Sequence, residues 1–340
     1  MSKHILVTGA TGVLGSALIA NLAAHKVTAL VHKRPTRATT AVVGDITRAR
    51  LGIDKREYQA LCANVDIVIH CAGVVDFTAD ATAMRTVNVE GVRRITEFAA
   101  DADAEMIHVS TAYVARRDTP KSTTGSHLLD PVGYIESKCL GEDMLREAGV
   151  AASIVRPSII VGDSKTGYIA EYQGLHKFIR MILANRVPFI PAVIDSYIDM
   201  VPQDVVVAAL VGLVSGDLAP GEYWITSGTK ALTARALLRL LKAEAATNGI
   251  DLSGLRILNP EMVDRLMRPA FFDEVPESFV RRLEQLMTIC SQLFTEEVLP
   301  SSFDHLDPQD AVNPENVWQL AIRHVLHSRD RRLADTLQNP

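Results

Sequence analysis

The stretch "LVTGATGVLG", residues 6–15, decides the fold of this chain. It leads from an apolar strand-like segment, "HILVTG", into a helical pattern that starts at Gly12. Gly9, Gly12 and Gly15 stand at GxxGxxG spacing, which allows a tight turn and a close approach of the backbone to a ligand. The helix that follows offers free N–H groups and the positive end of its dipole to an anion. In this strand–turn–helix setting the motif predicts a dinucleotide-binding site.

The alternation of strand and helix patterns continues through the first half of the chain. Their apolar runs are nearly continuous, which is typical of a parallel sheet covered by helices on both faces. With right-handed crossovers, this predicts an α/β fold with a doubly wound parallel sheet of the Rossmann type. Further strands are expected at 27–32, 40–45, 65–73, 105–111 and 152–158, and helices at 53–63, 80–100 and 131–148.

The second half of the chain is less regular. A late strand is expected at "GEYWITS", and from about Thr229 the pattern is mostly helical. We therefore expect a dinucleotide-binding domain at 1–162, to which 200–228 returns. Residues 163–199 and 229–340 are expected to form a smaller, mostly helical substrate-binding domain with aromatic and apolar pocket residues.

Composition excludes several classes of protein. The 340 residues are 48% hydrophobic and 22% charged, with a formal net charge of −5 and no long basic run. A nucleic-acid groove or an anionic-membrane surface is not expected. The four cysteines are scattered without metal-ligand spacing, so they indicate buried thiols in a reducing compartment and no metal site. With neither a signal peptide nor a membrane-spanning segment in the pattern, we expect a cytoplasmic protein.

The end of the second strand indicates which dinucleotide binds. An NAD-specific site usually has an acidic residue there, but this chain has His32, Lys33 and Arg34. Cationic groups attract a 2′-phosphate that a carboxylate would repel, so the sequence favours NADP(H). The alternative is a solvated basic loop. Asp45, after the third strand, is a candidate acceptor for the adenine amino group, or else a helix cap.

A further motif, "YIESK", occupies residues 134–138. Tyr134 and Lys138 are four residues apart, so on a helix they share one face. They are either an acid–base pair or two side chains on an ordinary solvated helix. Five residues alone leave both readings open.

Several motifs in order carry a resemblance to a known family. They are TGxxGxxG at 8–15, "GD" at 44–45, "CAG" at 71–73, "NVEG" at 88–91, "VSTAYV" at 109–114, "YIESK" at 134–138 and "RPSIIVG" at 156–162. With them the chain resembles the extended short-chain dehydrogenase/reductase family. "HVSTAY", "GYIESK" and "VRPSIIVGDSKTG" make it most similar to the thioester-reductase and fatty-acyl-reductase branch. The likeness covers roughly the first 230 residues well and the helical tail loosely.

The resemblance implies a catalytic set. Thr111 would hold the substrate oxygen, Tyr134 would donate and accept the proton, and Lys138 would lower the tyrosine pKa and bind the nicotinamide ribose. A phenol with a pKa near 10 needs such a neighbouring ammonium to work at neutral pH. The expected cofactor-binding residues are Gly9, Thr11, Gly12, Val13, Leu14, Gly15, His32, Lys33, Arg34, Asp45, Ile46, Cys71, Ala72, Gly73, Lys138, Pro157, Ser158 and Ile159.

Cys71 and Asn88, near this set, are interpreted as structural residues. The family commonly has Asn where this chain has Cys71, which we interpret as a packing substitution whose backbone still lines the cofactor. Asn88 is expected to tie backbone between strands, and a catalytic water relay is the less favoured alternative.

The favoured activity is NADPH-dependent reduction of an acyl thioester, on coenzyme A or on a carrier protein, to an aldehyde or alcohol. The chain starts at its first strand, so the acyl substrate is expected in trans. Lys165 would meet the phosphate of a phosphopantetheine arm, unless it is simply a solvated loop lysine. The alternatives are a ketone/alcohol dehydrogenase acting on a hydrophobic or polyketide-like substrate, and a non-catalytic NADP-binding regulator. A homodimer is usual in the family, and the sequence leaves the oligomeric state open.

Overall fold

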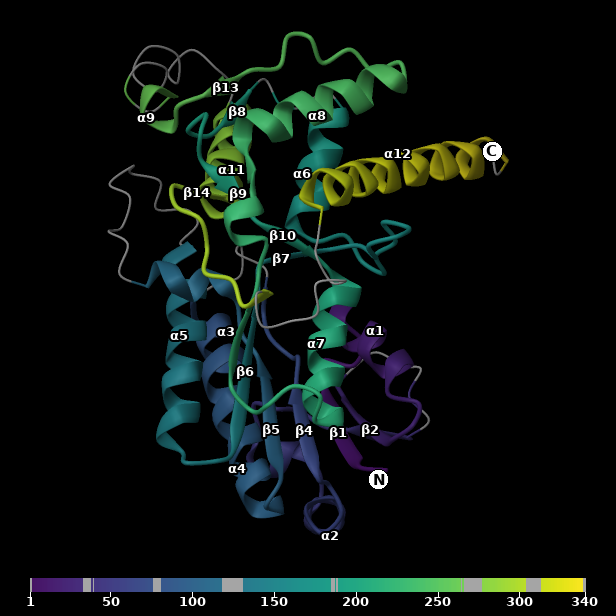
Figure 1. Cartoon of the computed structure of the whole chain (residues 1–340), viewed down its shortest axis with the longest axis vertical. Helices are drawn as coiled ribbons and strands as arrows, with labels where there is room; N and C mark the ends of the chain where they lie inside the picture. Colours follow the sequence, from purple (N-terminus) through teal and green to yellow (C-terminus); the bar gives the residue numbers. More distant parts are fainter. Residues whose placement is uncertain are drawn as a thin grey trace.

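The computed structural model describes residues 2–32, 38, 40–75, 81–117, 131–184, 187, 189–263, 265, 277–303 and 313–338. Seven parallel strands form its main sheet, in the order β11-β6-β5-β4-β1-β2-β3 (Figure 1). The strands are β1 (His4–Thr8), β2 (Lys26–Val31), β3 (Thr40–Val43), β4 (Ile67–His70), β5 (Glu105–Val109), β6 (Ala152–Pro157) and β11 (Glu222–Ile225). The doubly wound parallel sheet expected from the sequence is confirmed. The order reverses between β1 and β4, the position where such sheets bind ligands.

Helices cover both faces of the sheet, as the apolar strands require. On one face α1 (Val13–Asn21) packs against α7 (Gln203–Ser215). The other face is covered by α2 (Lys55–Cys62), α4 (Gly91–Ala102) and α5 (Pro131–Glu147). A short helix α3 (Ala81–Arg85) and a π-helical turn (Thr86–Glu90) lead directly into α4. The Asp54 carboxylate caps α2 by accepting from two backbone N–H groups.

The second half of the chain builds a mostly helical part above the sheet, as Figure 1 shows. Its helices are α6 (Gly174–Leu183), α8 (Ala234–Thr247), α9 (Pro260–Met262), α11 (Glu277–Leu293) and α12 (Pro314–Gln338). Short strand pairs connect these helices, and the helical pattern of the sequence did not reveal them. The pairs join β7 (Ile159–Val161) with β10 (Met200–Pro202), β8 (Ile190–Pro191) with β13 (Ile257–Leu258), and β9 (Tyr197–Ile198) with β12 (Leu232–Thr233) and β14 (Phe294–Thr295).

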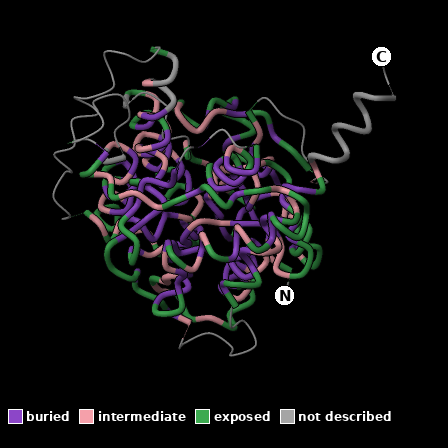
Figure 2. Tube along the Cα trace, turned by 90° about the horizontal axis from the view of Figure 1, so that it is seen from above, coloured by how far each residue is buried: buried purple, intermediate pink, exposed green. Residues whose placement is uncertain are grey.

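The buried side chains form three cores, and Figure 2 shows the buried residues gathered in the interior of the trace. Two lie on the opposite faces of the main sheet, and the third lies within the helical part around Phe178 and Trp318. We propose on this basis the domain division expected from the sequence, because β11 and α7 join the sheet cores while α6, α8, α11 and α12 share their own. Within the described residues, no helix is both long enough and apolar enough to cross a bilayer.

Candidate active site

The glycine turn lies at the carboxyl end of β1, directly against the end of β4. Gly9 has a φ of 68°, and a Cβ there would lie 2.6 Å from the backbone N of Ala72. A Cβ on Gly15 would lie 2.2 Å from the Gly9 carbonyl oxygen, so only glycine fits at both positions. Gly12 precedes α1, and no side chain caps this helix N-terminus. Its first N–H groups are thus available, and the turn fits the pyrophosphate of a dinucleotide.

The segment after β4 is held by Asn88, which lies in the π-helical turn. The Asn88 side chain accepts from Val74 N at 2.8 Å and donates to Val74 O at 3.0 Å. Its amide also donates to the Ser137 hydroxyl at 3.1 Å. Asn88 therefore ties the backbone after Gly73 to helix α5, rather than one strand to another. Cys71 is half-buried, and burial raises the pKa of its thiol to about 12, which suits a packing role.

The end of β2 meets the turn after β3 at His32 and Asp45. His32 Nε2 lies 3.9 Å from the Asp45 carboxylate, and Arg48 Nε lies 3.4 Å from it. The carboxylate also accepts from the backbone N and the hydroxyl of Thr47, at 2.9 and 2.7 Å. Asp45 thus caps a turn, and its contact with adenine remains a proposal. Lys33 and Arg34, the residues expected to choose NADP(H), lie outside the described residues.

The three expected catalytic residues come together at the carboxyl end of β5. Thr111 follows this strand and is 5% exposed, and its hydroxyl lies close enough to the phenol of Tyr134 on α5 to lower the pKa of that phenol. Lys138 lies one turn further along α5, and its ammonium donates to the Val109 carbonyl at 2.9 Å. All three side chains are buried, so the sequence motifs from two distant segments converge on one position.

Burial dominates the protonation of this pair. It raises the pKa of Tyr134 to about 12, while the Thr111 hydrogen bond acts in the opposite direction. Burial also lowers the pKa of Lys138 to about 8, with the Glu142 and Cys71 side chains opposing this. The expected lowering of the Tyr134 pKa by Lys138 is therefore not seen in the isolated chain. The physical reason is that desolvation penalises the phenolate, while the ammonium is bonded to a backbone carbonyl.

Two groups beside the triad were not recognised as a pair from the sequence. Tyr113 is buried, and its hydroxyl donates to the Leu293 carbonyl at 3.3 Å. Asp199 is 1% exposed and accepts from Ser227 N and Gly228 N at 2.8 and 2.9 Å. Burial and then the Asp199 charge raise the pKa of Tyr113. Because its hydroxyl is already bonded to a backbone carbonyl, Tyr113 suits a wall of the site better than an acid.

Two histidines lie below the triad within the sheet. His70 on β4 and His108 on β5 are paired across the strands, and their rings stack with centroids 5.4 Å apart. His70 Nδ1 is hydrogen-bonded to the Thr8 hydroxyl at 2.7 Å, whereas neither ring nitrogen of His108 has a partner within the described part of the chain. Burial lowers the pKa of His70 to about 3 and that of His108 well below its usual range. Both rings are therefore neutral near pH 7.

The segment after β6 was expected to meet the nicotinamide. Ser158 N donates to the Ile225 carbonyl at 3.0 Å and Ile159 N to the Asp199 carbonyl at 3.3 Å. Pro157 has no N–H group. A backbone contact of Pro157, Ser158 or Ile159 with the cofactor would therefore use carbonyl oxygens, and it remains a proposal.

The loop that follows is an ordered turn. The Asp163 carboxylate accepts from Lys165 N and from Thr166 N and its hydroxyl. The Lys165 side chain is exposed. A few residues further on, a cavity of about 570 Å³ is lined by residues 168–172, by Lys177 and Arg180 of α6, and by His324 and Ser328 of α12. Tyr168 and Tyr172 both contact the His324 ring there.

Together, the doubly wound sheet, the glycine turn at its switch point and the Tyr–Lys pair on α5 define a dinucleotide-binding oxidoreductase of the extended short-chain dehydrogenase/reductase class. Residues 24–210, more than half of the chain, match the NAD-binding family described as male sterility protein, and the chain belongs to this family. This confirms the resemblance to the thioester-reductase and fatty-acyl-reductase branch.

Relatives and solved structures agree with this family. The chain is 28% identical over 229 residues to the hybrid PKS-NRPS synthetase poxE of Penicillium oxalicum, covering 62% of this chain and 6% of that protein. It is 25% identical over 270 residues to the L-2-aminoadipate reductase large subunit of Candida glabrata, covering 63% of this chain and 19% of that subunit. The terminal R domain from the myxalamid PKS-NRPS pathway shares the fold, with a TM-score of 0.72, 23% identity and coverage of 96% and 91%. The chain thus spans only a small part of these curated relatives.

Proposed function

We propose that this protein is an NADPH-dependent reductase of acyl thioesters, with Thr111, Tyr134 and Lys138 as its catalytic residues. The observation that carries the proposal is that three buried side chains, Thr111, Tyr134 and Lys138, lie together at the carboxyl end of β5, with Lys138 one turn from Tyr134 on the same helix. The curated relatives include, by name, a hybrid PKS-NRPS synthetase and an L-2-aminoadipate reductase, which supports reduction of an acyl group as the proposed activity.

The residues have separable roles in this reaction. The glycine turn would hold a nicotinamide cofactor, which would supply the hydride for the thioester carbonyl carbon. Thr111 donates a hydrogen bond to the carbonyl oxygen, where negative charge develops. Tyr134 donates its proton to that oxygen and Lys138 stabilises the phenolate that remains. The resulting hemithioacetal loses the thiol and leaves an aldehyde, so one thiol is released for each NADPH oxidised in this step.

The preference for NADPH rests on Lys33 and Arg34 beside His32. We expect NADPH to bind at least tenfold more tightly than NADH, about 1.4 kcal/mol. Arg34→Ala should remove most of this difference, because the guanidinium is a strong partner for a 2′-phosphate. Fluorescence titration with both cofactors measures it, and equal affinities in the unmutated protein would contradict the preference.

The carrier phosphate has two candidate contacts. Lys165 is exposed at the turn after β7, and Lys177 lines the neighbouring cavity. We expect Lys165→Glu to raise KM for carrier-bound or CoA-bound acyl groups while sparing free aldehydes. Lys177→Glu is the matched comparison, and it would show the larger effect if the cavity holds the phosphate.

The decisive experiment follows thiol release and NADPH oxidation together, across short and long acyl thioesters, aldehydes and ketones. Equal amounts of thiol and NADP⁺ in the aldehyde-forming step support the proposal. NADPH-dependent ketone reduction without thiol release would identify a ketone dehydrogenase. Cofactor binding with no turnover of any of these substrates would favour a regulator.

A further inference from the structure

The helix that carries the proposed catalytic pair carries a third buried functional group on the same face. Tyr134, Lys138 and Glu142 stand at successive intervals of four residues on α5, so they line one side of the helix about 6 Å apart along its axis. Glu142 is only 3% exposed. A carboxylate buried that deeply needs a partner that offsets the cost of desolvating its charge.

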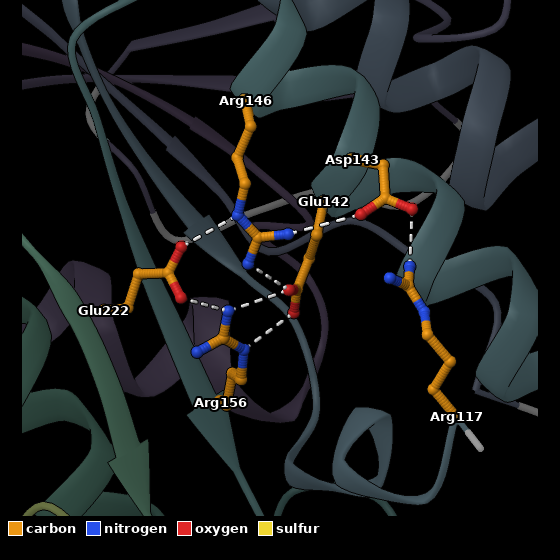
Figure 3. Close-up of polar contacts among 6 residues, drawn as sticks. All are labelled: Arg117, Glu142, Asp143, Arg146, Arg156 and Glu222. Atoms are coloured by element: carbon orange, nitrogen blue, oxygen red, sulfur yellow. Dashed lines mark hydrogen bonds and ion pairs between the residues drawn. The ribbon is translucent and has the colours of Figure 1, made fainter.

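The partner of Glu142 is Arg156, which comes from β6 and is 2% exposed. Arg156 Nε and Nη2 donate to the two Glu142 carboxylate oxygens at 2.9 and 2.8 Å, a bidentate ion pair (Figure 3). The guanidinium also donates to Glu222 of β11 at 2.6 Å and lies 4.5 Å from the centre of the Trp224 ring. The pair therefore fastens α5 to two strands of the sheet.

The outer side of the cluster is more exposed. Arg146 joins Glu142 and Glu222 at 2.9 Å each, and Asp143 pairs with Arg146 and with Arg117 (Figure 3). The exposed pairs contribute little to stability, because water screens them. A buried pair is likewise often no more stabilising than an apolar replacement. Stability alone therefore does not account for Glu142 and Arg156.

The groups around Lys138 show how the charge of Glu142 affects the pKa of the lysine. Lys138 is surrounded by His70 and Cys71 at the end of β4, by His108 on β5, and by Tyr134 on its own helix. Both histidines are neutral near pH 7, because burial lowers the pKa of each. Burial lowers the pKa of Lys138 to about 8, and Glu142 is the first of the groups that oppose this.

We propose that Glu142 is a positioning residue for Lys138: clamped by Arg156, its carboxylate fixes the height of α5 against the sheet and holds a negative charge one turn from the ammonium. The proposal rests on the proposed function in one respect: Glu142 affects catalysis only if Lys138 is a catalytic residue. Its physical content, the coupling of the two side chains, can be tested without substrate or cofactor.

The test compares Glu142→Gln and Arg156→Gln with Asp143→Asn as the matched control on the same helix. Asp143→Asn removes ion pairs at the exposed side and leaves the buried pair intact. Each variant, and the unmutated chain, is also made with Lys138→Met. The pH at which the melting-temperature gap within each such pair begins to close reports the ionisation of Lys138 in the folded protein. The pH profile of NADPH-dependent turnover is the second readout.

In the unmutated chain the gap should begin to close near pH 8, where the ammonium starts to lose its proton. Glu142→Gln should move this point, and the alkaline limb of turnover, roughly one pH unit lower, because the opposing negative charge is gone. Arg156→Gln should move both in the other direction, because the carboxylate loses its counter-charge. Asp143→Asn should leave both unchanged.

Opposite shifts for the two partners are the decisive result, since a general loosening of α5 would move both variants the same way. Shifts in one direction, or lower melting temperatures with unchanged pH dependence, would overturn the proposal. If Glu142→Gln does not fold, the direction seen with Arg156→Gln decides. If no thioester is reduced by the unmutated protein, the proposed function fails. The melting experiments still test whether Glu142 and Lys138 are coupled.

Discussion

At the scale of single residues, removing the hydroxyl of Tyr134 distinguishes a role in acid–base catalysis from a role in packing. Tyr134→Phe removes one oxygen from a buried ring and should leave folding and NADPH affinity nearly intact. Turnover should fall at least a hundredfold, because general acid catalysis is worth about that much. Tyr113→Phe is the matched control, since the Tyr113 hydroxyl donates to the Leu293 carbonyl. Kinetics with direct cofactor titration measure both, and a near-normal rate in Tyr134→Phe would show that another group supplies the proton.

The buried Lys138 ammonium leads to a second prediction, on the pH dependence of stability, which can be tested without substrate. Burial holds its pKa near 8, against about 10.4 in an unfolded chain. The folded state therefore binds fewer protons between these values, and its stability rises as the pH rises through that window. Below pH 8 the buried ammonium costs roughly 3 kcal/mol.

Lys138→Met should accordingly raise the melting temperature at pH 7 by a few degrees, and the gain should vanish near pH 10.5. Thermal melts across this range test it, with Lys177→Met as a control because Lys177 is exposed. A gain that is independent of pH would mean that Lys138 binds its proton equally in the folded and unfolded chain, so that burial does not lower its pKa. A stability cost at a proposed catalytic position is the expected trade-off between activity and stability.

At the scale of single elements, the turn between β1 and α1 was the most predictable feature of the molecule. Its glycines are required by contacts within a few residues of the turn and by the neighbouring end of β4. Gly15→Ala should therefore weaken cofactor binding strongly and destabilise the fold by about 1–3 kcal/mol, because its Cβ would lie 2.2 Å from the Gly9 oxygen. Gly174→Ala at the start of α6 is the control, since nothing lies within 4 Å of its Cβ. Cofactor titration and denaturant unfolding should separate the two variants.

Other elements could not be read from the sequence, for physical reasons. Strands such as β9, β12 and β14 have two residues each, which is too short for a period of alternation. The Asp199 carboxylate accepts hydrogen bonds from backbone N–H groups that lie far along the chain, so its neighbours in the sequence do not reveal its role. The pKa of Tyr134 depends on burial by the folded chain, which no motif reports. Glu142 did carry a signal, its spacing of four residues from Lys138, but spacing alone does not identify Arg156 as its partner.

At the scale of the whole molecule, the doubly wound parallel sheet followed from local alternation and right-handed crossovers. The packing of the helical part did not, because it depends on contacts such as the one between Trp318 and α8, where the indole donates to the Leu237 carbonyl at 3.2 Å. The separate cores support the proposed division into a dinucleotide-binding part and a substrate-binding part. They also imply that damage to one core should leave the other part working.

Trp318 and Phe98 provide a matched pair for that test, because both are fully buried, one in the helical core and one in a core of the sheet. Each change to alanine should cost about 3–5 kcal/mol. Phe98 packs at the back of β4 and β5, edge-on to Tyr58, so Phe98→Ala should disturb the strand ends and weaken NADPH binding. Trp318→Ala should instead leave NADPH affinity within about threefold, below 1 kcal/mol, while raising KM for the acyl substrate. Melts and cofactor titrations of both variants measure this. Equal losses of cofactor affinity would mean that the two parts form one cooperative unit.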